Sequence, residues 1–159
     1  MTDSFDTAQA AAALGESVRN VLADMAFLDA WPRTPSGASD SPESRAAIDV
    51  LKPASFRLEL RMPPDFAAKV AAIILCDEPA GADASDGTFR GDDTVLEILN
   101  VIAGSFVTRY FGPGAVPRLE LPHFKYYADG SEGEEICSLD FDVEGLPLRV
   151  VLSSIRYRY

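Results

Sequence analysis

An acid and an amide lie three residues apart in the most helix-like segment of the second half of the chain. Glu97 and Asn100 would be about 60° apart around a helix axis, because residues three or four apart share one side of a helix. Asp93 precedes Glu97 by one turn, and Gly104 follows Asn100 by one turn. An amide donates to and accepts from water without carrying charge. These residues predict a small polar notch that a partner can approach closely.

The opposite face of the same segment, residues 92–111, is apolar and predicts an amphipathic helix packed on a core. Its apolar residues recur at spacings of four, three and four: Val95, Leu99, Ile102 and Phe106. Thr94 and Glu97 also have the spacing of a capping box, in which the carboxylate only secures the helix start. Polar side chains are common on solvated helix faces, so spacing alone leaves the role of the notch open.

The rest of the chain carries no glycine-rich phosphate loop, metal-ligand cluster or nucleophile motif. His123 is the only histidine, and we expect it to be a strand-end residue without a catalytic role. Cys76 and Cys137 lie far apart in sequence and are expected to be buried thiols, not a disulfide. The acidic run between Asp77 and Asp93 lacks the spacing of a calcium loop and is expected to be solvated.

Composition predicts one domain over residues 1–159, with exposed loops at 32–44 and 79–91. The hydrophobic content of 47% argues against disorder. The net charge of −11 disfavours nucleic acid and anionic membrane as partners. No apolar run reaches the roughly 20 residues that span a bilayer, and the N-terminal residues lack the basic start of a signal peptide. We therefore expect a cytoplasmic protein.

The remaining patterns predict an α+β fold, with long helices against a mostly antiparallel sheet. An alanine-rich helix is expected from Phe5 to about Leu28, capped by Ser4 or Asp6 and ended by Trp31-Pro32. A second, largely apolar helix is expected over 65–76. Alternating apolar and polar residues predict most of the strands. The expected strands are residues 46–51, 55–62, 118–124, 136–143 and 146–155.

The notch and its flanks resemble the CheX/CheC/FliY family of chemotaxis phosphatases. That family is marked by Asp or Ser, three residues, Glu, two residues and Asn on one exposed helix, with a proline just over twenty residues later. Asp93, Glu97 and Asn100 match this spacing, and Pro122 falls one residue short of it. The continuation Asn100-Val-Ile-Ala-Gly104 resembles the Asn-Met-Ile-x-Gly of CheX-type members.

A single copy of the motif resembles the CheX type. CheC-type members carry it on two pseudo-symmetric helices, whereas the first helix here offers Glu16-Ser-Val-Arg19, with arginine where asparagine is required. The strand and alanine-rich helix over Ser55–Cys76 resemble the preceding segment of the family. The resemblance therefore implies a single CheX-like domain with the CheC-like fold and a homodimer.

The resemblance also implies a substrate, a phosphorylated CheY-like response regulator. The partner would carry the aspartyl phosphate and Mg²⁺, so the chain would need no metal or cofactor of its own. Asn100 would hold the attacking water in line, and Glu97 would pair with the invariant lysine of the receiver. Asp93, Gly104 and Pro122 would contribute to docking, with Gly104 leaving room for the receiver's backbone.

Two alternatives remain open. The same helix could bind a receiver or a flagellar-switch component without catalysis. A stand-alone hydrolase using Asp93 and Glu97 as acid and base is the weaker alternative, because carboxylates on an exposed helix have little reason for perturbed pKa values.

Overall fold

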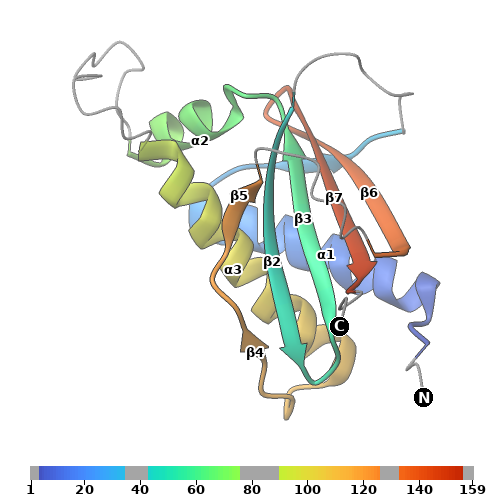
Figure 1. The fold of residues 1–159 in the computed structure, drawn as a ribbon. Coiled ribbons are helices and arrows are strands. Elements are labelled where there is room, and N and C mark those ends of the chain that lie inside the picture. The colour runs from blue at the N-terminus through green and yellow to red at the C-terminus, as the bar shows by residue number, and fades with distance from the viewer. Residues whose placement is uncertain (1–3, 35–42, 76–89, 126–132, 156–159) are drawn as a thin grey trace.

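The computed structural model describes residues 4–34, 43–75, 90–125 and 133–155, in which a seven-stranded sheet packs against helices (Figure 1). The elements in chain order are α1 (Thr7–Ala26), β1 (Ala30–Pro32), β2 (Ser44–Lys52), β3 (Phe56–Met62), α2 (Phe66–Leu75), α3 (Arg90–Phe111), β4 (Arg118–Leu119), β5 (His123–Lys125), β6 (Glu135–Val143) and β7 (Leu146–Ser154). The predicted α+β class is confirmed. Within these described ranges, none of the helices combines the length and the apolar character needed to cross a membrane.

The strand order reveals two equivalent halves that the sequence did not establish. The strands run β1-β6-β7-β3-β2-β4, with β5 also paired to β2, and every pairing is antiparallel. Read from either end, an edge strand is followed by a hairpin, and the two hairpins meet where β3 pairs with β7. Along the chain, α1 precedes the edge strand β1 and the hairpin β2–β3, whereas α3 precedes the edge strands β4 and β5 and the hairpin β6–β7. Each edge strand pairs with the hairpin of the other half. The two long helices therefore occupy corresponding positions.

The core lies between the helices and one face of the sheet. On β3, Phe56, Leu58, Leu60 and Met62 are at most 2% exposed, as the alternation predicted. The stripe predicted on residues 92–111 is also in this core. Burial of side chains of this size, at roughly 25 cal/mol per Å², is the main term that orients the helices.

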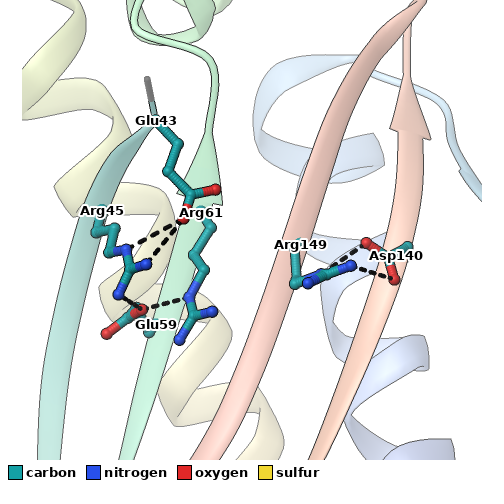
Figure 2. Close-up of polar contacts among 6 residues, drawn as sticks. All are labelled: Glu43, Arg45, Glu59, Arg61, Asp140 and Arg149. Carbon is teal, nitrogen blue, oxygen red and sulfur yellow. Dashed lines mark hydrogen bonds and ion pairs between the residues drawn. The ribbon is translucent and has the colours of Figure 1, made fainter. Parts of the chain in front are cut away.

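The other face of the sheet carries ion pairs (Figure 2). Glu59 of β3 is 7% exposed, and its Oε1 lies 2.6 Å from Arg61 Nε and 3.8 Å from Arg45 Nη1 of β2. Arg149 of β7 pairs across the strands with Asp140 of β6, Nε to Oδ1 at 2.9 Å. Cross-strand pairs of opposite charge stabilise this face while keeping it polar. The apolar face is thereby left to receive the helices.

Helix boundaries confirm one sequence prediction and correct another. The N-cap of α1 is Asp6, whose carboxylate accepts from the backbone N–H of Gln9 at 3.0 Å. The helix α3 begins at Arg90, so the predicted loop 79–91 is wrong at its last two residues. The early start brings Gly91 against the first turn of α2, where it is buried. Residues 76–89, which include Cys76, lie outside the described residues.

Strand boundaries supply the other corrections. The predicted loop 32–44 is wrong at both ends, because Pro32 belongs to β1 and Ser44 begins β2; residues 35–42 lie outside the described residues. The single strand predicted over 118–124 is two short strands, β4 and β5. Pro122, in the break between them, has no N–H to donate to a strand ladder.

Substituting alanine at Gly91 is expected to lower the free energy of unfolding by about 2 kcal/mol. A Cβ at this position would collide with the backbone carbonyl of Ala67 and lie 2.8 Å from the backbone nitrogen of Ala68. Gly15→Ala in α1 is the matched control. Its Cβ would meet only Leu139 Cδ1, at 3.6 Å, and alanine should stabilise that helix by about 0.5–1 kcal/mol. Urea unfolding measures both; a Gly91→Ala protein as stable as the parent would contradict the close approach.

Candidate functional site

Four of the predicted site residues lie in one row on the outer face of α3. Asp93, Glu97 and Asn100 are exposed, and Gly104 is partly exposed one turn beyond Asn100. The opposite side of the helix is fixed in the core. There, Val95, Leu99, Ile102 and Phe106 are at most 1% exposed. Because a helix is rigid over this length, burial of that stripe directs the notch outward.

The capping-box interpretation of Glu97 is wrong. Thr94 is the fifth residue of α3, not its N-cap, because the helix starts at Arg90. The side chains of Glu97 and Asn100 make no hydrogen bond or ion pair with another described residue. Asparagine is mildly unfavourable inside a helix, and the described part of the chain makes no use of its amide. Both functional groups are available to a partner.

Gly104 is not required by the fold as described. A Cβ built on it would have no neighbour within 4 Å. Glycine in a helix interior costs roughly 0.5–1 kcal/mol relative to alanine. Val101, 36% exposed, lies beside it on the outer face. A bare backbone next to an exposed apolar side chain suits close approach by another molecule.

Pro122 is not on this helix face. It lies in the connection between β4 and β5, which pair with β2 at one edge of the sheet, and α3 also contacts β2 (Figure 1). Its neighbour Leu121 is 88% exposed. The part that Pro122 plays in docking stays a prediction.

The first turn of α3 is acidic, with Asp92 and Asp93 near the positive end of the helix dipole. Burial, and secondarily the charge of Asp93, raises the pKa of the Asp92 carboxyl. Over the described ranges, no group of three or more His, Cys, Asp or Glu side chains is arranged to hold a metal ion. Asp93 and Glu97 are exposed to solvent in the described part of the chain, which disfavours a water-excluding hydrolytic site of their own.

His123, which we expected to have no catalytic role, and Cys137, which we expected to be a buried thiol, both lie within the described residues. His123 is exposed at the start of β5. Cys137 is 9% exposed on the core face of β6, as predicted. Burial, and then the nearby charge of Glu135, raises the pKa of its thiol to about 11. The thiol is therefore protonated at neutral pH and serves in packing.

Comparison with known proteins agrees with this arrangement. No family model and no curated protein matches the sequence. A chain of the CheX–CheY–BeF3–Mg²⁺ complex from Borrelia burgdorferi superposes with a TM-score of 0.63 at 19% identity, over 92% of this chain and 97% of that one. A CheC-like protein from Shewanella sp. PV-4 gives a TM-score of 0.67 at 17% identity, over 91% and 96%. The chain has the CheC-like fold.

FliY from Thermotoga maritima shares this fold, with a TM-score of 0.64 at 11% identity over 96% of this chain and 91% of that one. The resemblance predicted from the motif on α3 is thus confirmed at the level of the fold. Identities this low leave activity to be argued from the site, because one fold hosts several functions.

Gly104→Ala is expected to raise the free energy of unfolding by about 0.5–1 kcal/mol, because alanine is the better helix former and meets no neighbour. Thermal or urea unfolding beside Gly15→Ala measures the gain, and the two should be similar. A destabilised Gly104→Ala protein would show that the fold itself needs the glycine.

Proposed function

We propose that the chain belongs to the CheC/CheX/FliY family and accelerates hydrolysis of the aspartyl phosphate of a CheY-like response regulator. The observation that carries this proposal is the Glu97–Asn100 pair. Both side chains are exposed, without partners among the described residues, and lie beside a glycine that the fold does not require. The CheC-like fold supports the same assignment.

In the proposed reaction, the partner holds the phosphoryl group on its aspartate and carries Mg²⁺, so this chain adds what is missing. The Asn100 amide accepts from or donates to a water molecule and holds it in line with the phosphorus. The water oxygen bonds to phosphorus as the bond to the aspartyl oxygen breaks, giving inorganic phosphate and a free carboxylate. Misplacing a reacting group by about 1 Å can cost about 10²-fold in rate.

Glu97 fixes the register of docking in this proposal. Its carboxylate lies one turn before Asn100 on the exposed face, where a lysine of the receiver can reach it. An exposed ion pair contributes only about 0.2–1 kcal/mol, so Glu97 chiefly selects the docked orientation. Gly104 and Val101 then admit the partner's backbone and an apolar contact. Among the similar structures, a complex of CheX with CheY supports a CheY-like partner.

The assembly and location follow the same proposal. We infer a homodimer, as in CheX-type members, with Asp93 and Pro122 as further docking residues. A response regulator as partner places the protein in the cytoplasm.

Asn100→Ala is expected to reduce the acceleration of receiver dephosphorylation by about 10²-fold. The measurement is decay of a ³²P-labelled receiver with and without the protein. Gln9→Ala, which removes an exposed side-chain amide from α1, is the matched control and should act as the parent does. Acceleration that survives Asn100→Ala would refute the role of the amide. Binding by the parent without any acceleration would instead favour a non-catalytic receiver-binding module.

Gly104→Ala is expected to weaken receiver binding by about tenfold, because the added methyl group occupies space needed by the partner's backbone. Isothermal calorimetry with a phosphorylation-mimicking receiver measures the change. Gly15→Ala controls for the stability gain and should bind normally. Unchanged affinity in Gly104→Ala would mean that the partner does not approach this backbone.

A further inference from the structure

A groove of about 400 Å³ runs along the outer face of α1 and is separate from the notch on α3. Its lining comes from three parts of the chain: Glu16, Arg19, Asn20 and Ala23 of α1, Arg109 near the end of α3, and Leu28 to Trp31 in the turn into β1. This volume is within the range of small-molecule sites, about 300–1,000 Å³. None of the predicted site residues contributes to it.

The groove lies on the part of α1 that corresponds to the notch. Residues 16–22 and 97–103 have the same order of exposed and buried positions, and their helices occupy corresponding places in the two halves of the fold. In this alignment Arg19 stands where Asn100 stands on α3. A guanidinium donates five hydrogen bonds and accepts none. The α1 surface is therefore suited to bind an oxyanion and unsuited to accept a hydrogen bond from an attacking water.

Arg19 is the available cation of the groove. Its side chain is exposed and makes no hydrogen bond or ion pair with another described residue. Arg109, by contrast, is engaged by Glu16, Nη1 to Oε2 at 3.1 Å. The net charge of −11 opposes anions at long range, but salt screens such fields over about 8 Å at physiological ionic strength. Within the groove, Glu16 is paired with Arg109, so Arg19 is the cation that remains to bind an anion, beside the carboxylate of Asp29.

Trp31 and Asp29 supply two further kinds of recognition. The Trp31 side chain is 62% exposed, which leaves a large indole surface for a flat ring to stack on. The backbone of Asp29 is held in place, because its N–H donates to Glu144 Oε1 at 3.1 Å. The Asp29 carboxylate at the groove accepts hydrogen bonds from amino or hydroxyl groups.

We propose that this groove binds a small anion of the nucleoside monophosphate class. Arg19 binds the oxyanion, Trp31 stacks on the base, and Asp29 accepts from ribose hydroxyls or an exocyclic amine. The site is independent of the proposed phosphatase activity.

The test uses Trp31, the single tryptophan of the chain, so intrinsic fluorescence excited at long wavelength reports the groove directly. AMP should produce a saturable change in emission at physiological salt. Adenosine, which lacks the anion, and inorganic phosphate, which lacks the ring, should each bind more weakly. Absence of a saturable response to AMP, or equal affinity for AMP and either fragment, would overturn the proposal.

Arg19→Gln should raise the Kd for AMP by about tenfold or more, the usual loss for one charge-assisted hydrogen bond. Arg118→Gln, at an exposed arginine of β4 near the other edge of the sheet, is the matched control and should leave the Kd unchanged. Asn100→Ala should also bind AMP normally, which separates this site from the notch. An unchanged Kd in Arg19→Gln would overturn the assignment.

Discussion

The contact between Phe106 of α3 and Phe56 of β3 is the constraint on which the geometry of the notch depends. Both rings are fully buried, and they meet edge to face with centroids 5.4 Å apart. Phe5 and Tyr110 extend the cluster, with Phe5 5.6 Å from Phe56 and 5.2 Å from Tyr110. The Tyr110 hydroxyl accepts from the backbone N–H of Asp6 at 2.9 Å, which joins the start of α1 to the end of α3. Once this face is buried, the helix can present only its polar face to a partner.

A rigid support and an open surface together suit a site that is completed by another molecule. Catalytic groups need placement within about 0.5 Å, which helices achieve better than loops. Here the support is the buried stripe of α3, and the open surface is the row from Asp93 to Gly104. In the described part of the chain, the side chains of the notch are exposed to solvent. An enzyme acting alone would need an enclosed site, whereas a partner that brings a phosphoryl group would supply the enclosure on docking.

The two halves of the fold show how one architecture presents different chemistry. The helices α1 and α3 bury matching positions against the same sheet, yet the side chains on their outer faces differ. On α3 the amide of Asn100 is followed one turn later by Gly104. At the corresponding positions α1 has the guanidinium of Arg19 and the methyl group of Ala23. An amide can orient water, and a guanidinium can only donate to an acceptor. The internal symmetry therefore specifies where two surfaces lie, and the residue types specify what each surface can do.

The sequence by itself determined the features that are local. The 3.6-residue period over Val95–Phe106 predicted the helix and its outward face, and the alternation over 136–152 predicted two strands with their buried sides, because both patterns arise from backbone geometry within one element. Four of the site residues could be placed together for the same reason.

Tertiary structure decided what depends on segments distant in sequence. The start of α3 at Arg90, where Gly91 is buried against α2, had no signal in the sequence, and it rules out the capping box that the spacing of Thr94 and Glu97 allowed. The three-residue strand β1 is a strand only because β6 pairs with it. The groove on α1 is lined in part by Arg109, some 90 residues away in sequence, and by the turn from Leu28 to Trp31. The sequence predicted only that the first helix ends at this turn. Such features carry no periodic signal, because the atoms that create them meet only after the chain has folded.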